Sequence, residues 1–212
     1  MPEMLSLIDH LVFATPDLEA GISHIENLFG IEATAGGRHP GFGTRNALVS
    51  LGQHTYLEIV GPDPLRDTER KPAIFELATI DRPQLVTWAA RSDDLDVVVT
   101  NARRAGVDLG DVSPGSRMRP DGILLEWKLT DPYRDRMDGI IPFFIDWGTT
   151  PHPASSLAQP CRLVDLVLSH TDPSPVEDAL RAMTDVPIPV SRSDRRCITA
   201  TVRTPNGLVT LE

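Results

Sequence analysis

His10 and Glu58 each stand among apolar residues, in segments 8–14 and 56–60. Both segments have the composition of β-strands, and because side chains alternate faces along a strand, His10 should share a face with Ile8. An imidazole nitrogen and a carboxylate oxygen that project from two strands of one sheet can together bind a divalent ion such as zinc, manganese, nickel or iron. The alternative is structural: His10 donates to a backbone carbonyl, and Glu58 pairs with an arginine.

His39 is the candidate for a third metal ligand or for a catalytic base. It lies in Arg38–Gly43, where three of the six residues are Gly or Pro, so we expect a loop that can approach a ligand closely. With His10 and Glu58, His39 would complete a set of two histidines and one carboxylate that leaves positions open for substrate or oxygen. The alternative is an exposed loop histidine.

Three further residues are candidates for binding a substrate. Arg45 and Asn46 are neighbours on a predicted strand, so at most one of them faces a given side of the sheet. Arg45, or Arg117 in the polar segment Ser116–Gly122, which we predict to be a loop, could hold a carboxylate through paired hydrogen bonds. The alternative for either arginine is an ion pair with a nearby acid.

Two aromatic residues complete the candidate site. Trp127 shares a strand face with Leu125 and Leu129, which predicts a place in the core or in the wall of a cavity. His152 lies between two prolines and could transfer a proton, since imidazole titrates near neutral pH. The alternative for His152 is a solvent-exposed residue on a stiff loop.

Composition limits the function classes. The 212 residues carry a formal net charge of -10, which disfavours nucleic acid and anionic membranes as partners. Two isolated cysteines and the lack of a signal-like N-terminal segment predict a reduced, cytoplasmic protein. The segment Gly41–Gly43 lacks the third glycine and the following helix that a dinucleotide site needs, so no nucleotide cofactor is expected.

Helical and strand periodicity recurs three times along the chain. The first unit, about residues 6–61, has a strand at Leu7–Thr15, a helix between Asp17 and Gly30, a short strand within Ile31–Ala35, and strands at 46–51 and 55–60. The second unit, about residues 85–148, repeats this order with a strand, a helix that begins after Asp94, and strands at 123–129 and 141–147.

The third segment, residues 161–212, is shorter and ends in a hairpin around Pro205–Gly207. These patterns predict an α+β protein in which residues 1–160 form paired βαβββ units, and their mixed, mostly antiparallel sheet curves like a barrel around a cavity. The third, truncated unit should cover the pair or pack across the interface of a homodimer, since a free strand edge favours association.

The chain resembles the vicinal oxygen chelate superfamily, and within it the glyoxalase-like domain group of bacterial proteins. The segments that carry the resemblance are Asp9–Leu18, Gly36–Leu48, Tyr56–Ile59, Arg119–Gly122 and Ile145–Gly148. The resemblance implies the fold shared by glyoxalases, bleomycin resistance proteins and dihydroxybiphenyl dioxygenases, with metal ligands on the first and last strands of each unit.

Carried over to this chain, the pattern gives His10 and Glu58 as ligands in the first unit. In the second unit Thr87 stands where a histidine would be, and Asp146 lies near the last ligand position. The leading hypothesis is a metal-dependent lyase, isomerase or dioxygenase that acts on a small, carboxylated organic substrate. The alternative is a metal-free protein of the same fold that binds or sequesters a small molecule.

Overall fold

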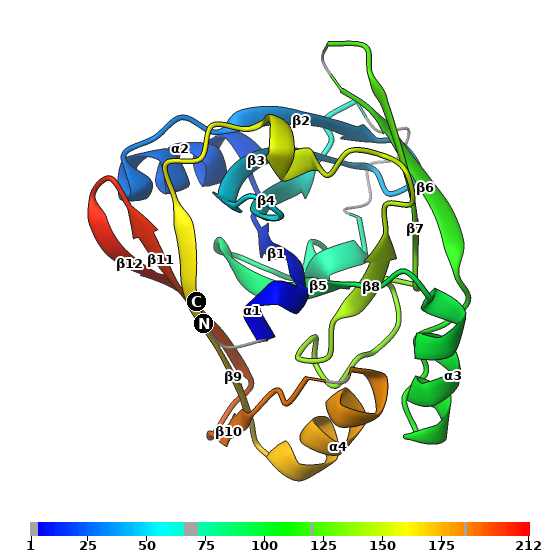
Figure 1. The fold of residues 1–212 in the computed structure, drawn as a ribbon. Helices are drawn as coiled ribbons and strands as arrows, with labels where there is room; N and C mark the ends of the chain where they lie inside the picture. Colours follow the sequence, from blue (N-terminus) through cyan, green and yellow to red (C-terminus); the bar gives the residue numbers. More distant parts are fainter. Residues whose placement is uncertain (1–3, 66–71, 120, 185) are drawn as a thin grey trace.

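The computed structural model describes residues 4–65, 72–119, 121–184 and 186–212. Within these ranges the strands form an eight-stranded sheet and a four-stranded sheet (Figure 1). The first unit consists of β1 Ile8–Ala14, α2 Leu18–Phe29, β2 Thr34–His39, β3 Thr44–Gly52 and β4 Thr55–Pro62, preceded by the single turn α1 Met4–Leu7. The second unit consists of β5 Gln84–Arg91, α3 Leu95–Arg104, β6 Ser113–Met118, β7 Leu124–Leu129 and β8 Phe143–Asp146.

The two long helices begin where the capping residues predict. The Asp17 side chain accepts a hydrogen bond from the backbone N–H of Ala20 at the start of α2, and Asp94 accepts one from Val97 at the start of α3. Gly30 ends α2 with a positive φ of 71°, a conformation that costs glycine little. Local sequence therefore determines both helices.

The eight-stranded sheet has the order β2-β3-β4-β1-β5-β8-β7-β6. In both units the first strand pairs in parallel with the last, and the units meet where β1 runs antiparallel to β5. The edge strands β2 and β6 approach each other, which nearly closes the curved sheet. The predicted α+β fold of repeated βαβββ units is confirmed.

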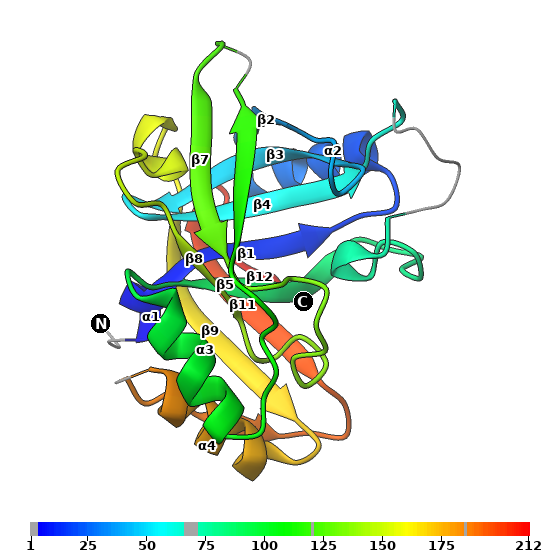
Figure 2. The same cartoon turned by 90° about the vertical axis from the view of Figure 1, so that its right-hand side faces the viewer.

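The C-terminal segment forms the four-stranded sheet, in the order β10-β9-β11-β12, and α4. Its elements are β9 Arg162–His170, α4 Pro173–Met183, β10 Val190–Arg192, β11 Cys197–Thr204 and β12 Gly207–Leu211. Here the first strand pairs antiparallel with β11, so this segment does not repeat the pairing of the first two units. It packs against the outer side of the eight-stranded sheet, as the views in Figures 1 and 2 show. The predicted homodimer stays a prediction.

The two faces of the large sheet have different partners. On β1, Leu11 and Phe13 join the main core with the helices and the C-terminal sheet. Val12 and Ala14 point to the concave side, where they pack with Phe143 and the partly buried Trp127. The concave side is therefore a second, smaller core, and it surrounds the candidate site.

Two strands differ from the sequence-based expectation. β2 covers Thr34–His39, further along the chain than the predicted Ile31–Ala35, and β6 covers Ser113–Met118, where a loop was predicted at Ser116–Gly122. Both strands are rich in Gly, Ser and polar residues, which have low strand propensity. Pairing with β3 and β7 brings them into the sheet, and the β6–β7 hairpin stands out from the rest of the molecule in Figure 2.

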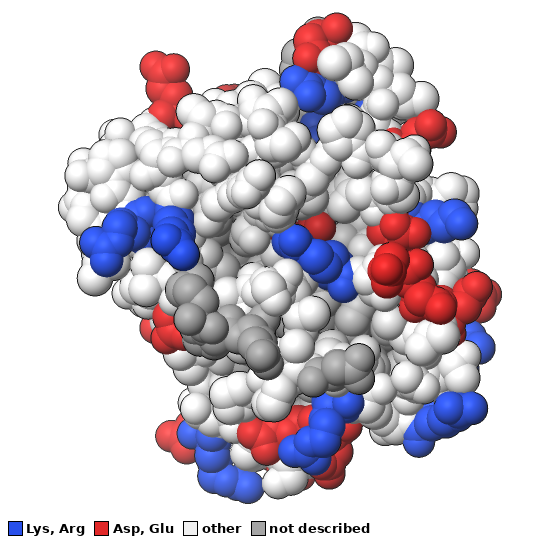
Figure 3. Space-filling view, viewed as in Figure 1, with Lys and Arg blue, Asp and Glu red and all other residues white. Residues whose placement is uncertain are grey.

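The surface carries the acidic excess unevenly. Acidic side chains gather on the face shown in Figure 3 near the start of α3, where Asp93, Asp94, Asp96 and Asp146 line a surface groove. None of the helices in the described parts of the chain is long and apolar enough to span a membrane.

Candidate functional site

A cavity of about 50 Å³ opens on the concave side of the large sheet. We call it the inner cavity. It has room for roughly four water-sized groups. The residues that line it are His10, His39, Phe42, Asn46, Tyr56, Glu58, Phe75, Arg117, Trp127, Leu129, Phe143, Ile145 and Trp147. Six of the residues predicted from the sequence are in this set: His10, His39, Asn46, Glu58, Arg117 and Trp127.

A β-bulge brings Asp9 and His10 to the same site. The pairing of β1 with β5 shifts register between Ile8 and His10, so Ile8 packs in the main core and does not share the face of His10, contrary to simple alternation. The His10 Nδ1 atom lies 2.8 Å from Asp9 Oδ1, and both residues are buried. A buried carboxylate beside Nδ1 holds the ring orientation and favours the tautomer whose Nε2 is free to accept a proton.

Asp9 is also held from the other side. Its Oδ2 atom accepts a hydrogen bond from Trp147 Nε1 at 3.1 Å and lies 3.2 Å from His152 Nε2. The backbone N–H of Ala154 donates to His152 Nδ1, which leaves Nε2 of His152 as the donor to Asp9. Burial alone would raise the pKa of Asp9, but the hydrogen bonds from His10 and His152 hold it well below its ordinary value.

His152 therefore reaches the site without lining the inner cavity. It lies on the segment that precedes the 3-10 helix η2 Pro153–Ser156, and it caps that helix. It touches Asp9 and not the cavity itself, so its place is that of a positioning residue for the Asp9–His10 pair. The proton-transfer role predicted for His152 stays a prediction.

Glu58 faces His10 across the cavity. Its Oε2 atom is 3.8 Å from His10 Nε2, and its Oε1 atom accepts a hydrogen bond of 2.5 Å from Asn46 Nδ2. Tyr56 stacks on the His10 ring with centroids 4.6 Å apart. These contacts leave the imidazole with little freedom to rotate, so its Nε2 atom stays directed at the space beside Glu58.

Arg117 is a buried cation with little compensation. Arg117 is 5% exposed, and its Nη1 atom has no hydrogen-bond partner among the described residues. None of the ion pairs found within the described ranges includes it. Burial lowers the pKa of Arg117, and the nearby Tyr56 and Glu58 partly oppose that change. A buried charge of this kind is costly unless a further partner compensates it.

Two glycines of β2 allow Arg117 to lie here. A Cβ atom on Gly36 would come within 2.1 Å of Asn46 Oδ1 and 3.1 Å of Arg117 Nη1. One on Gly37 would come within 2.8 Å of the backbone oxygen of Met118. The close approach of β2 to β6, and with it the position of the arginine, therefore requires glycine at both places.

His39 is the last residue of β2 and lines the inner cavity, although the sequence predicted a loop. Its Nδ1 atom lies 3.2 Å from Thr44 Oγ1. Burial lowers the pKa of His39 to about 4, and the charges of Arg117 and His10 act in the same direction, whereas Glu58 opposes them. His39 is therefore neutral at physiological pH.

Arg45 does not line the inner cavity. Its guanidinium forms an ion pair with Glu19 on α2, with Nη1 2.9 Å from Oε1. The physical reason is strand alternation, since Asn46 takes the cavity side and Arg45 takes the opposite side. Among the described residues, the anchoring role predicted for Arg45 or Arg117 is therefore geometrically open only to Arg117.

The metal pattern of the superfamily can be tested through the symmetry of the two units. Asp94 follows Asp17 by 77 residues, and the same offset relates His10 to Thr87. The same offset relates Val12 to Ala89. The antiparallel pairing of β1 with β5 agrees with this equivalence, because Val12 lies opposite Thr87 and His10 lies opposite Ala89. Thr87 thus occupies the position equivalent to His10, and its hydroxyl donates to the backbone oxygen of Gly139.

The second carboxylate position is also changed. Val12 lies opposite Glu58 in the parallel pair β1–β4, and Ala89 lies opposite Phe143 in the parallel pair β5–β8. Phe143 therefore stands where the second unit would supply a carboxylate. Asp146, which sequence reasoning placed near that position, lines the acidic groove and not the inner cavity.

The residues present do not fit a four-ligand metal centre, since two of its four positions are Thr87 and Phe143. Within the described ranges, no three His, Cys, Asp or Glu side chains are grouped so that they could hold a metal ion. His10 and Glu58 remain as a pair, and His39 lines the same cavity without completing such a group. A cationic arginine in the same cavity further opposes a divalent cation.

Comparison with known proteins identifies the family. A family model described as "Glyoxalase-like domain" matches residues 8–184. This chain belongs to the glyoxalase-like domain family. The glyoxalase-like domain thus spans both βαβββ units and the first part of the C-terminal segment, and it places the chain in the vicinal oxygen chelate superfamily. A search of curated proteins found no match to the chain.

One solved structure shows the same fold over almost the whole chain. A hypothetical protein from Staphylococcus aureus matches 97% of this chain and 85% of its own, with a TM-score of 0.64 and 14% identity. Two methylmalonyl-CoA epimerases match less of the glyoxalase-like chain. The Mycobacterium tuberculosis enzyme covers 66% of this chain and 85% of its own at TM-score 0.42 and 18% identity. A Streptomyces coelicolor enzyme in complex with 2-nitronate-propionyl-CoA covers 69% and 97% at TM-score 0.46 and 22% identity.

Sequence reasoning missed Asp9, Tyr56, Phe143 and Trp147 as parts of the site. The one available signal was the adjacency of Asp9 to His10, but alternation placed the two on opposite faces. Only the bulge in β1, which depends on pairing with β5, brings both side chains to the same place.

Proposed function

We propose that this glyoxalase-like protein binds a small organic acid in the inner cavity and transfers a proton on it. Arg117 anchors the carboxylate, and His10, oriented by Asp9, accepts and returns the proton. The observation that carries the proposal is the buried guanidinium of Arg117: its Nη1 atom lacks a partner among the described residues, and the residue lines the same cavity as His10.

A carboxylate ligand would supply what Arg117 lacks. The planar guanidinium matches a carboxylate with two parallel hydrogen bonds. Each charge-assisted hydrogen bond contributes about 1.5–3 kcal/mol, and the ligand would also relieve the cost of the unpaired donor. The small volume of the cavity suits the head group of such an acid.

The chemistry follows from the free Nε2 atom of His10. The C–H bond beside a carbonyl of the bound acid breaks, the proton moves to Nε2, and the electron pair moves to the carbonyl oxygen as an enolate. The positive charge of Arg117 stabilises the enolate, and the imidazolium is stabilised by Asp9 and by Glu58, 2.8 Å and 3.8 Å away. Return of the proton to a carbon completes an isomerisation. In an elimination the carbonyl re-forms as the bond from the neighbouring carbon to a leaving group breaks, and His10 gives its proton to that leaving group.

No step of this proposal passes through a metal ion, because the donor set of the second unit does not fit one. A second candidate function is ligand binding without catalysis. It is favoured by the 2.5 Å hydrogen bond between Asn46 and Glu58, which already occupies one oxygen of that carboxylate. Both functions require Arg117, and only the enzyme requires His10 as a base.

Two measurements test the proposal with pyruvate and 2-oxobutanoate as probes. Calorimetry measures their binding to the parent protein, Arg117→Met and the control Arg103→Met, whose arginine is more than half exposed on α3. We expect a roughly 10- to 100-fold loss for Arg117→Met, the equivalent of one charge-assisted hydrogen bond, and no change for the control. Equal binding by Arg117→Met and the parent protein would overturn the proposal.

Proton NMR in D2O then measures deuterium incorporation beside the carbonyl group. We expect the parent protein to accelerate exchange, and His10→Gln to bind the acid with exchange at the uncatalysed rate. Binding without accelerated exchange by the parent protein would favour the second candidate function.

A further inference from the structure

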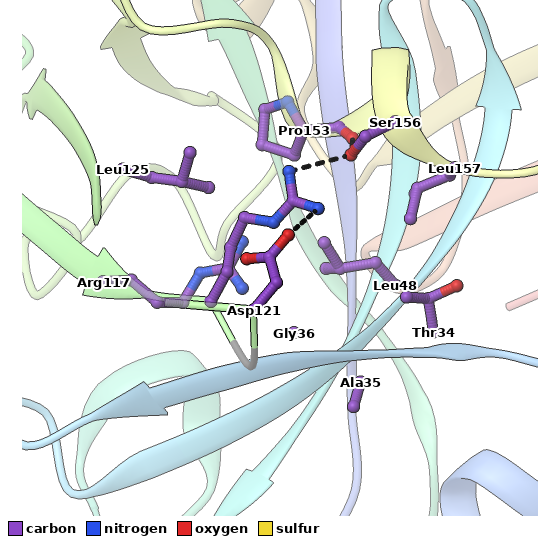
Figure 4. A pocket seen from close by; sticks show the side chains of 11 residues that line it. Thr34, Ala35, Gly36, Leu48, Arg117, Asp121, Leu125, Pro153, Ser156 and Leu157 are labelled. Carbon is purple, nitrogen blue, oxygen red and sulfur yellow. Dashed lines mark hydrogen bonds and ion pairs between the residues drawn. The ribbon is translucent and has the colours of Figure 1, made fainter. Parts of the chain in front are cut away.

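A second cavity, of about 290 Å³, shares the lining residue Arg117 with the inner cavity, and Figure 4 shows the residues that line it. We call it the outer cavity. Leu48, Leu125 and Leu157 give it apolar walls, from β3, β7 and the segment after η2. Its volume is at the lower end of the range for pockets that take small organic ligands.

The two cavities follow the same faces of the same strands. On β3, Asn46 lines the inner cavity and Leu48 lines the outer one; on β7, Trp127 lines the inner cavity and Leu125 the outer one. Side chains two residues apart on a strand are separated by roughly 7 Å. Arg117 lines both cavities, so it stands at their junction.

The charges of the outer cavity are balanced apart from Arg117. Arg119 pairs with Asp121 at 2.8 Å and donates to Ser156 at 3.2 Å, the two dashed contacts in Figure 4. Arg117 lies at the junction, and its buried Nη1 atom has no hydrogen-bond partner among the described residues. An occupant of both cavities would therefore meet the guanidinium of Arg117 at the junction, with apolar walls beyond it.

We propose that the outer cavity holds the apolar body of the acid whose head group lies in the inner cavity. The substrate class is then amphipathic: a carboxylic acid with a neighbouring carbonyl group and an alkyl chain or ring of several carbons. This inference rests on the proposed function, since it assumes that Arg117 anchors the head group. It adds that chain length beyond the head group determines affinity.

Binding of 2-oxobutanoate and 2-oxooctanoate, measured by calorimetry, tests the inference. Each buried methylene strengthens binding about fourfold, so four additional methylenes should give at least about tenfold tighter binding even with incomplete burial. Thr34→Trp should remove this gain and leave 2-oxobutanoate binding unchanged, because exposed Thr34 lines only the outer cavity. Thr210→Trp, at an exposed threonine of β12, is the matched control and should change neither affinity.

The outcomes separate this inference from the function on which it rests. If both acids bind in an Arg117-dependent way with equal affinity, or if Thr34→Trp leaves the longer acid unaffected, the inference is overturned and the proposed function stands. If neither acid binds, or if both bind Arg117→Met as well as the parent protein, the proposed function fails and the inference fails with it.

Discussion

Replacing Asp9 by asparagine is the sharpest test of the hydrogen-bonded network behind His10. Asp9 is 0% exposed and accepts from three side-chain N–H groups, at 2.8 Å from His10, 3.1 Å from Trp147 and 3.2 Å from His152. Asparagine has the same shape, but it offers a single acceptor oxygen. Its amide NH2 group must then face a position where another N–H already points.

The size of the effect follows from these contacts. At least one charge-assisted hydrogen bond is lost, worth about 1.5–3 kcal/mol, and the others weaken because the acceptor becomes neutral. We expect Asp9→Asn to lower the free energy of unfolding by about 2–4 kcal/mol, and the melting temperature by roughly 5–12 °C for a chain of this size. Urea denaturation at pH 7 measures the first quantity and calorimetry the second.

The pH dependence gives an independent readout. The folded-state pKa of Asp9 is lowered below the unfolded value of 3.8, so its stabilising contribution is complete above that pH and is lost as the pH falls further. The difference in the free energy of unfolding between the parent protein and Asp9→Asn should therefore be present above about pH 4 and should narrow below it.

The control for this experiment is Asp178→Asn, whose side chain is 74% exposed. We expect the control to change stability by less than about 0.5 kcal/mol. A loss of under about 1 kcal/mol for Asp9→Asn, with the same pH profile as the parent protein, would refute the network as described.

Three further predictions concern other parts of the site. Burial lowers the pKa of His39 from 6.5 to about 4, so between these pH values the unfolded chain binds a proton that the folded chain does not. Acidification across this range therefore destabilises the fold by at most about 3 kcal/mol. His39→Gln should lose this pH dependence of the free energy of unfolding in urea titrations from pH 7 to 4, and an unchanged pH dependence would contradict the prediction. Gly36→Ala places a Cβ atom 2.1 Å from Asn46 Oδ1, so we expect a lower melting temperature and weaker binding of 2-oxobutanoate. Values of both equal to those of the parent protein would show that β2 can shift to accommodate the methyl group. Arg45→Ala removes a partly exposed ion pair with Glu19 and should lower the free energy of unfolding by less than about 1 kcal/mol, while calorimetry should show unchanged binding of the acid. A tenfold loss of binding would show that Arg45 takes part in binding the acid.

Much of the fold can be predicted from the sequence, because it depends on interactions between residues that are close along the chain. Asp17 and Asp94 predict the starts of two helices, since a cap needs only the backbone of the next turn. The spacing between these caps also predicts that Thr87 is equivalent to His10, which the register of β1 and β5 supports. The resemblance to the superfamily places His10 and Glu58 on the first and last strands of one unit, and in the structure these two strands are paired.

The sequence does not predict the features of the site that depend on pairing between distant segments. β6 contains few residues that favour a strand, so Arg117 enters the cavity only because β6 pairs with β7 and approaches the glycines of β2. Asp9 joins His10 through a bulge that only the antiparallel partner strand determines. His152 reaches Asp9 across 143 residues of sequence. Local propensity carries no information about such contacts. The sequence by itself therefore determined the repeated unit and its candidate ligands, and only the tertiary structure decided that these residues surround a buried arginine in place of a four-ligand metal centre.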